Sequence, residues 1–201
     1  MNRKAFFDTC RKGVMGPTLD GDEVSGAGAI IDAMAGAPLA YTAYALATAW
    51  HETAHTMQPI REFGGTAYLK RMYDIEGQRP KLARGMGNTV PGDGVRYCGR
   101  GYVQLTWRSN YRRAGEKLGY PLEGNPELAM RKDIAAQIMR RGMEEGWFTG
   151  KAFSHFLPFD GPANRADFIN ARRIINGRDK DALIADYAVQ FQDALIAGGW
   201  A

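Results

Sequence analysis

The stretch of the chain that is most informative about its fold is Gly99-Arg100-Gly101-Tyr102-Val103-Gln104-Leu105-Thr106-Trp107-Arg108-Ser109-Asn110-Tyr111. Apolar positions alternate between Arg100 and Trp107, which predicts a short extended strand. Ser109-Asn110 then opens a helix that we expect to reach about Leu118. The two glycines at the start permit a close approach of the backbone. The segment therefore predicts a strand that leads into a helix.

The side chains of this segment fit two interpretations. Gln104 and Thr106 are two residues apart, so in a strand they lie on one side, where each offers hydrogen bonds. Trp107, Asn110 and Tyr111 add flat rings and an amide. Sugar-binding surfaces use this mixture of amides, hydroxyls and rings. The alternative is a buried strand-to-helix corner in which Trp107 and Tyr111 belong to the core.

The rest of the chain is mostly helical in pattern. Pro59 should end one helix, because proline has no amide hydrogen and constrains the residue before it. The region 64–99 is rich in glycine and contains two prolines, which predicts ordered loops with short strands. The helices that we expect are 22–35, 39–57, 109–118, 125–147, 164–175 and 179–197. The sequence therefore predicts a mainly helical fold with a small irregular β element.

The composition is that of a globular protein. The 201 residues are 45% hydrophobic and 24% charged, which fits one domain, or one domain with two lobes. A net charge of +4 is explained by solubility, and it also permits a modest preference for anionic polymers such as bacterial wall. No Lys/Arg-rich run indicates a nucleic-acid-binding arm, so we expect no nucleic-acid partner.

The cysteines and the N-terminal segment bear on the compartment. Cys10 and Cys98 are too few for a disulfide scaffold and predict free thiols made in a reducing compartment, with a single bridge as the alternative. Residues 1–8 are partly basic but lack the apolar stretch of a signal peptide, and no segment is long enough to span a bilayer. The sequence therefore predicts no signal peptide and no stable membrane insertion.

The segment His51-Glu52-Thr53-Ala54-His55 matches the zinc-binding pattern His-Glu-x-x-His. On a helix, His51 and His55 would share one face, where they could bind zinc while Glu52 activates a water. A third ligand would be needed, and the candidates are Glu76, Asp74 and His155. The pattern is short, however, and histidines on such a helix also serve simply as hydrogen-bonding groups.

A second interpretation uses carboxylates and no metal. Glycoside hydrolysis needs one carboxylic acid to protonate the leaving oxygen and one carboxylate to activate water or form a glycosyl intermediate. Glu52 follows an apolar helix, a setting suited to an acid, and Glu62 is the natural partner. One straight helix would separate them by about 15 Å, too far for the ~6.5–9.5 Å of an inverting pair, but Pro59 breaks that helix. The alternative for Glu62 is a solvated carboxylate beside Arg61.

Three blocks of the sequence together resemble the family 19 glycoside hydrolases, which comprise chitinases and related phage endolysins. The pattern Gly-Arg-Gly-x-x-Gln-Leu-Thr-Trp-x-x-Asn-Tyr in residues 99–111 is similar to the family's signature. His51-Glu52-Thr53 resembles the segment of the catalytic acid, and residues 171–177 resemble an Ile-Asn-Gly segment near the active-site cleft. Residues 51–60 are most similar to the endolysin branch.

This resemblance implies roles for individual residues. Glu52 would be the general acid and Glu62 the general base, although plant chitinases place their second glutamate further along the chain. Thr106 would help to hold the attacking water, and His55 would support the site instead of binding zinc. The residues that would bind or flank the sugar are Gln104, Asn110 and Asn176, with Tyr97, Tyr111 and Trp107 as flanking or packing residues. Arg172 or Arg173 would orient a carboxylate.

The resemblance also implies a fold and a function. The fold would be mainly α (α+β), a two-lobed lysozyme-like fold with a small irregular β element and a central cleft. Residues 1–201 would form a single catalytic domain without a wall-binding module. The protein would be a monomeric endolysin that cleaves β-1,4-glycosidic bonds of peptidoglycan with inversion, using no metal or other cofactor. It would stay in the host cytoplasm until a holin-type lesion releases it to the periplasm and cell wall.

The alternatives belong to other classes. One is a zinc-dependent peptidoglycan endopeptidase or amidase that uses His51 and His55, and another is a chitinase of the same family. A non-catalytic wall-binding protein is disfavoured, because the residues that the resemblance assigns to catalysis and sugar binding are present.

Overall fold

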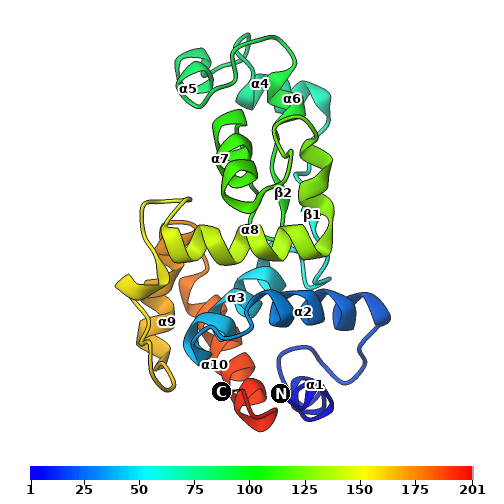
Figure 1. The fold of residues 1–201 in the computed structure, drawn as a ribbon, viewed down its shortest axis with the longest axis vertical. Helices are drawn as coiled ribbons and strands as arrows, with labels where there is room; N and C mark the ends of the chain where they lie inside the picture. Colours follow the sequence, from blue (N-terminus) through cyan, green and yellow to red (C-terminus); the bar gives the residue numbers. More distant parts are fainter. Residues whose placement is uncertain (201) are drawn as a thin grey trace. The chain divides into compact units, whose positions relative to one another are not determined.

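The computed structural model describes residues 1–200 and divides into two compact units (Figure 1). Unit 1 comprises residues 1–58 and the chain from Met139 onward, and unit 2 is Pro59–Ile138. Unit 1 contains α1 (Arg3–Cys10), α2 (Gly21–Ala33), α3 (Leu39–Glu52), η2 (Phe153–His155), α9 (Arg165–Ala171), η3 (Arg172–Ile174) and α10 (Asp181–Ala197). Unit 2 contains β1 (Ile60–Arg61), α4 (Thr66–Tyr73), α5 (Pro80–Gly85), α6 (Asp93–Arg96), β2 (Arg100–Gly101), α7 (Arg108–Leu118) and η1 (Pro126–Met130). The boundary at 138/139 falls within α8 (Lys132–Glu145).

The core of unit 1 is built around α3. Every residue from Ala40 to Trp50 is buried, as expected of a helix that is apolar on all sides. Its alanines favour the helical conformation and let neighbouring helices approach closely. Helix α10 packs against α3 and also contacts α9 and α1. The N-terminus and the C-terminal end of α10 lie side by side (Figure 1), where Asn2 N donates to Gly198 O at 2.7 Å.

Helix α3 ends at Glu52, five residues before the predicted end at Met57. Thr53 Oγ1 donates to Ala49 O at 2.7 Å and accepts from Met57 N at 3.0 Å, so its side chain closes the helix. Ala54, His55 and Met57 then have positive φ angles of 51°, 69° and 53°. The prediction that the helix continues to about Met57 is therefore wrong, and the chain turns sharply directly after Glu52.

A contact with α2 fixes this turn. The backbone of Met57 lies against Gly26, where a Cβ atom would come within 1.8 Å of Met57 O. Any other residue at position 26 would force the two segments apart. Met57 is itself fully buried. The end of α3 is thus decided by packing against a segment about thirty residues earlier, which local patterns do not reveal.

Unit 2 is organised around a two-stranded antiparallel ribbon. Strands β1 and β2 pair with Ile60 opposite Gly101 and Arg61 opposite Arg100. Beyond the ribbon, Glu62 N donates to Gly99 O at 2.8 Å, which continues the ladder by one pair. Helix α4 packs against α6, and η1 packs against β2.

Several sequence predictions for unit 2 need correction. The region 64–99 forms the three helices α4, α5 and α6, where loops with short strands were expected. The strand expected from Arg100 to Trp107 is only two residues long, because the chain turns back so that Arg100 and Leu105 pair with each other. The expected helix 125–147 is interrupted at Arg131, between η1 and α8.

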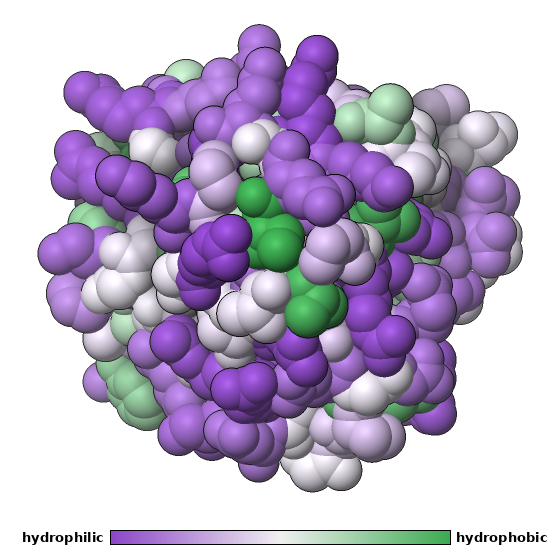
Figure 2. Space-filling view, turned by 90° about the horizontal axis from the view of Figure 1, so that it is seen from above, coloured by the Kyte–Doolittle hydropathy of each residue, from purple (hydrophilic) through white to green (hydrophobic). Residues whose placement is uncertain are grey.

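Most of the remaining predictions are confirmed. The helices expected at 22–35, 109–118, 164–175 and 179–197 are present as α2, α7, α9 with η3, and α10. Helix α1 was not predicted. Cys10 and Cys98 are free and buried, and burial raises the pKa of the Cys10 thiol to about 12. Within residues 1–200, no helix has the length and hydrophobicity that crossing a membrane requires. Figure 2 shows a mostly hydrophilic face with only small hydrophobic groups.

A cluster of arginines around Glu123 ties α7 to the segment that follows it. Arg108 Nε and Arg112 Nε each donate to the Glu123 carboxylate at 2.8 Å. Hydrogen bonds from Arg112 and Arg108 lower the pKa of Glu123 from 4.5 to about 2. The folded state therefore favours the ionised carboxylate more strongly than the unfolded chain does.

We expect this ion cluster to shape the acid stability of the protein. Because the folded pKa of Glu123 is depressed, its stabilising effect is fully present above pH 4.5 and is lost as the pH falls towards 2. In Glu123→Gln, the Tm should therefore fall less steeply between pH 4.5 and 2 than in the wild type. Thermal unfolding followed by circular dichroism at several pH values would measure this slope. Parallel Tm curves for the two proteins would contradict the prediction.

Candidate active site

In unit 1, Glu52 lies at the carboxyl end of α3 and is held by a buried arginine. Arg172 Nη1 donates to Glu52 Oε1 at 2.7 Å, and the Arg172 side chain is only 2% exposed whereas that of Glu52 is 23% exposed. Arg172 Nε donates to Asp179 O at 2.9 Å, which fixes the guanidinium. Arg173 is exposed. The structure thus resolves the choice between the two arginines, since Arg172 is the one that orients a carboxylate.

Two neighbours of this ion pair, His51 and Tyr44, are uncharged at neutral pH. Burial lowers the pKa of His51, so its imidazole is neutral. Burial also raises the pKa of Tyr44 to about 12, and its hydroxyl is fully enclosed near Arg172 and Glu52. Arg172 therefore orients the Glu52 side chain, which stays partly open to solvent.

The zinc interpretation does not fit the geometry of this segment. It requires His51 and His55 on one helical face, but α3 ends at Glu52 and His55 has a left-handed backbone. The His55 ring stacks on Trp50 at 4.7 Å, and its Nε2 lies 3.2 Å from the Tyr187 hydroxyl. Within residues 1–200, no group of three or more His, Cys, Asp and Glu side chains is arranged to hold a metal ion.

The suggested third ligands are engaged elsewhere or exposed. Asp74 is buried and accepts hydrogen bonds from Gly92 N and Gly94 N. His155 Nδ1 lies 3.0 Å from Ala152 N. Glu76 is exposed. Asp74 and His155 therefore stabilise local structure, and Glu76 is a solvent-exposed side chain.

In unit 2, Glu62 is held by two hydrogen bonds, one to each carboxylate oxygen. Tyr73 OH donates to Oε1 at 2.6 Å, and Gly99 N donates to Oε2 at 3.1 Å. Burial and the nearby carboxylate raise the pKa of Tyr73, so its hydroxyl stays protonated and remains a donor. Trp107 packs edge-on against the Tyr73 ring at 5.0 Å. Glu62 is therefore a fixed carboxylate and not the freely solvated one that its spacing alone would allow.

Three predicted residues of unit 2 converge over Gly99. A Cβ atom at position 99 would lie 2.6 Å from Gln104 Oε1, 3.1 Å from Glu62 Oε2 and 3.2 Å from Thr106 Oγ1. Gln104 and Thr106 do not achieve this as members of one strand, since Gln104 has a positive φ of 52° in a turn. Thr106 Oγ1 donates to Gln104 O at 2.8 Å, which closes that turn. We call Glu62, Gln104 and Thr106 the Gly99 cluster.

A methyl group at position 99 should disrupt this cluster. In Gly99→Ala, the Gln104 amide and the Glu62 carboxylate must move, because a 2.6 Å contact cannot be kept. If the cluster takes part in catalysis, kcat should fall by about 10²-fold, since misplacement by about 1 Å has effects of that size. Kinetics and the Tm of Gly99→Ala would test this, with Gly85→Ala as the control because a Cβ there meets nothing. Unchanged kcat in Gly99→Ala would exclude the cluster from the reaction.

Two other predicted residues belong to the core. Tyr111 is fully buried, its hydroxyl donates to Cys98 O at 2.8 Å, and it accepts from Arg100 Nη1 at 3.0 Å. Tyr97 is 2% exposed, and its hydroxyl donates to Glu123 O at 3.1 Å. Both tyrosine rings are therefore packed in the core, although Tyr97 also lines a pocket of unit 2, and a contact of either residue with substrate remains a prediction.

The remaining predicted residues keep accessible polar groups. Asn110 is half-buried, and its Nδ2 donates to Thr106 O at 2.8 Å, which supports the Gly99 cluster from the start of α7. Asn176 is exposed, and its Oδ1 accepts from Gly177 N at 2.9 Å. Their contacts with sugar remain predictions.

Sequence patterns did not identify Tyr73 and Gly99 as the residues that hold the Glu62 carboxylate. Tyr73 falls in the region that was expected to be loops, and nothing near it in the sequence marks it as a partner of Glu62. The glycines at 99 and 101 were predicted to allow close approach of the backbone. That Gly99 N donates a hydrogen bond to the Glu62 carboxylate was not predicted. Glu62 and Gly99 meet because β1 pairs with β2, and Tyr73 reaches Glu62 from α4.

The helices and the small β ribbon form an α-rich, lysozyme-like fold. Among solved structures this fold is that of family 19 chitinases. Chitinase C from Streptomyces griseus superimposes with a TM-score of 0.60 and 22% identity, over 96% of this chain and 75% of the chitinase. A bacterial family 19 chitinase gives a TM-score of 0.54 and 20% identity, over 96% and 93% of the two chains.

Sequence similarity to curated proteins is confined to short segments. An endochitinase of Arabidopsis thaliana is 44% identical over 43 residues, which is 21% of this chain and 15% of the plant protein. Chitinase 8 of Oryza sativa subsp. japonica is 59% identical over 32 residues, 16% and 12% of the two chains. No protein-family model matches the chain.

Proposed function

We propose that this chain is an endolysin that hydrolyses the β-1,4-glycosidic bonds of bacterial peptidoglycan. The observation that carries the proposal is that hydrogen-bond donors hold both predicted carboxylates in place, within a fold similar to that of family 19 chitinases. Glu52 is held by Arg172, and Glu62 is held by Tyr73 and Gly99 N. Because α3 ends at Glu52, the separation of about 15 Å along one straight helix does not apply to these two residues.

The proposed reaction is a single displacement. Glu52, protonated, donates its proton to the glycosidic oxygen as the bond from that oxygen to C1 breaks. Glu62 removes a proton from a water molecule whose oxygen bonds to C1 from the opposite face, so the anomeric configuration inverts. Thr106 helps to hold this water, and Gln104, Asn110 and Asn176 bind sugar groups.

Two features favour peptidoglycan over chitin in this proposal. Residues 51–60 resemble the endolysin branch of the family, and the two cysteines are free, unlike those of disulfide-bonded secreted chitinases. In the same proposal the protein accumulates in the cytoplasm of the host. A holin-type lesion then releases it to the wall, and host lysis follows.

Analysis of the products from purified peptidoglycan tests this function. We expect new reducing sugar ends, an inverted anomeric configuration of the first product by NMR, and full activity in the presence of a chelator. New amino groups that disappear with chelator would instead indicate a zinc peptidase or amidase and would overturn the proposal. Digestion of chitin oligosaccharides serves as the comparison.

The second candidate is a chitinase, which is favoured by the names of the similar proteins. It predicts a higher kcat/KM on chitin oligosaccharides than on peptidoglycan. The proposed endolysin predicts the reverse order, so one pair of kinetic measurements separates the two.

A further inference from the structure

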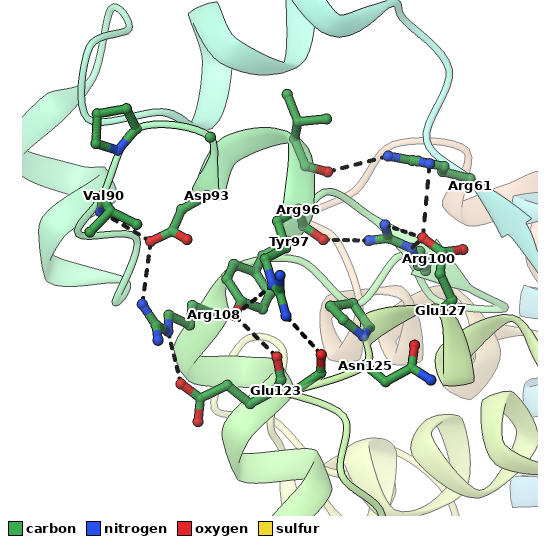
Figure 3. Close-up of a pocket in the computed structure, with 15 residues that line it drawn as sticks. Arg61, Val90, Asp93, Arg96, Tyr97, Arg100, Arg108, Glu123, Asn125 and Glu127 are labelled. Carbon is green, nitrogen blue, oxygen red and sulfur yellow. Dashed lines mark hydrogen bonds and ion pairs between the residues drawn. The ribbon is translucent and has the colours of Figure 1, made fainter.

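Unit 2 contains a large open pocket that the proposed reaction does not use. Its volume is about 1050 Å³, just above the range of roughly 300–1,000 Å³ that is usual for ligand sites. The walls come from β1, from residues 90–97 and from residues 123–127, together with Arg100 and Arg108 (Figure 3). None of the residues of the Gly99 cluster lines it.

The pocket and the Gly99 cluster lie on opposite faces of the β ribbon. Arg61 and Arg100 are directly paired, so their side chains share one face, and both line the pocket. Glu62 and Gly99 form the next pair and belong to the other face. Arg61 and Glu62 are neighbours in the chain, and adjacent Cα atoms are only ~3.8 Å apart. A ligand group that Arg61 binds in the pocket would therefore lie near Glu62.

Four arginines and three carboxylates line the pocket, and the arginines differ in how they are paired. Arg100 donates to Glu127 at 2.6 Å, and Arg108 lies between Glu123 and Asp93. These two cations are neutralised by close contacts.

Arg61 and Arg96 are exposed, and within residues 1–200 neither has a carboxylate within 3.5 Å of its guanidinium group. Arg61 Nη1 is 3.9 Å from Glu127, and its Nη2 donates to Val95 O at 3.3 Å. Arg96 donates to Gly124 O at 2.7 Å and to the Tyr97 hydroxyl at 3.2 Å, which are both uncharged groups. Figure 3 shows both guanidinium groups at the pocket. They are therefore placed to bind an anion.

We propose that this pocket binds a carboxylate of the peptidoglycan stem peptide through Arg61 and Arg96. The inference rests on the proposed function. Guanidinium groups bind carboxylates through paired N–H donors. Val90 is 50% exposed, and together with Pro91 and Pro126 it offers an apolar wall suited to alanine methyl groups. A dense phosphate polymer is disfavoured because it would meet the carboxylates of Asp93, Glu123 and Glu127.

The dimensions permit a glycan at the Gly99 cluster and its peptide in the pocket at once. An extended tetrapeptide spans roughly 13–14 Å, enough to pass from one face of a two-stranded ribbon to the other. Chitin has no carboxylate and cannot use Arg61 or Arg96 in this way. The pocket would thus select peptidoglycan over chitin.

Calorimetric titration with a synthetic stem tetrapeptide, L-alanyl-γ-D-glutamyl-L-lysyl-D-alanine, tests the inference. The wild type should bind the acid form at least tenfold more tightly than a form with both α-carboxylates amidated. Arg61→Gln/Arg96→Gln should weaken binding of the acid form at least tenfold, or about 1.4 kcal/mol. The matched control is Arg84→Gln/Arg113→Gln, which removes the same charge from exposed arginines of unit 2 outside the pocket and should stay within twofold.

Kinetics provide the second measurement. The ratio of the KM for peptide-stripped glycan to the KM for intact peptidoglycan should fall at least fivefold in Arg61→Gln/Arg96→Gln. The control variant should keep the wild-type ratio.

Several results would overturn the inference. These are no binding of the tetrapeptide, equal binding of its amidated form, equal weakening in the control variant, or displacement of the tetrapeptide by polyglycerol phosphate at equal charge. Because the tetrapeptide has no glycosidic bond, its binding is independent of hydrolysis. If the protein cleaves the wall but does not bind the tetrapeptide, only the inference about the pocket is rejected. If it binds the tetrapeptide but does not cleave the wall, only the proposed function is rejected.

Discussion

Glu52→Gln is expected to lower the kcat of peptidoglycan hydrolysis by about 10²–10⁴-fold, the usual contribution of a positioned general acid. The amide has the shape of the carboxyl group, and its oxygen can still accept the hydrogen bond from Arg172. It cannot deliver a proton to a leaving oxygen. The loss should therefore appear in kcat, with KM and the Tm nearly unchanged.

The measurement is release of reducing ends at saturating peptidoglycan, with the Tm recorded on the same preparation. Glu116→Gln is the matched control, because Glu116 is an exposed glutamate on α7 and belongs neither to the Arg172–Glu52 contact nor to the Gly99 cluster. Its kcat should equal that of the wild type. A Glu52→Gln protein that keeps more than a tenth of the wild-type kcat would remove Glu52 from the role of acid.

Arg172→Ala should have the largest effect on stability together with a large effect on activity. The Arg172 side chain is 2% exposed, and it donates hydrogen bonds to the Glu52 side chain and to Asp179 O. Its removal leaves these acceptors without a donor and opens a cavity, which together should cost about 2–4 kcal/mol. For a chain of this size the Tm should fall by roughly 2–4 °C per kcal/mol. The kcat should fall as well, because Glu52 loses its orientation.

Arg173→Ala is the neighbouring control, since that side chain is exposed, and its Tm should change little. Arg172→Lys separates charge from geometry. A lysine keeps the positive charge but cannot reach two acceptors with a planar fork, so kcat should recover only in part. Full recovery in Arg172→Lys would show that the charge alone matters, and an unchanged Tm in Arg172→Ala would contradict the role of the buried contact.

Sequence patterns predicted the helices whose formation depends on interactions between residues a few positions apart. The helices around α2, α7, α9 and α10 follow from apolar spacing and from N-terminal capping groups, such as Asp20, whose carboxylate accepts from Glu23 N at 2.7 Å. The helices of region 64–99 were missed because they are short and lie between glycines and prolines. For such segments, tertiary contacts outweigh propensity.

The candidate site shows the same division. Glu52 and Glu62 were proposed because glycoside hydrolysis needs two carboxylates, and the resemblance of three sequence blocks assigned roles to them and to Gln104 and Thr106. Arg172 was only one of two candidate arginines, because it is 120 positions from Glu52, and Tyr73 was not identified, because it lies eleven positions from Glu62 in a segment without a recognisable pattern. The tyrosines at 97 and 111 were ambiguous between packing and binding, and only their burial assigns them to the core.

The sequence by itself determined that this protein is mainly helical with a small β element, and it marked the residues that now lie in the Gly99 cluster. The tertiary structure decided where α3 ends, which arginine meets Glu52, and that Arg61 and Glu62 serve opposite faces of one ribbon. The physical reason is the range of the interactions. Capping and apolar periodicity act within a few residues, whereas the contacts of Met57 with Gly26, of Arg172 with Glu52 and of Glu62 with Gly99 join segments that are far apart in the chain.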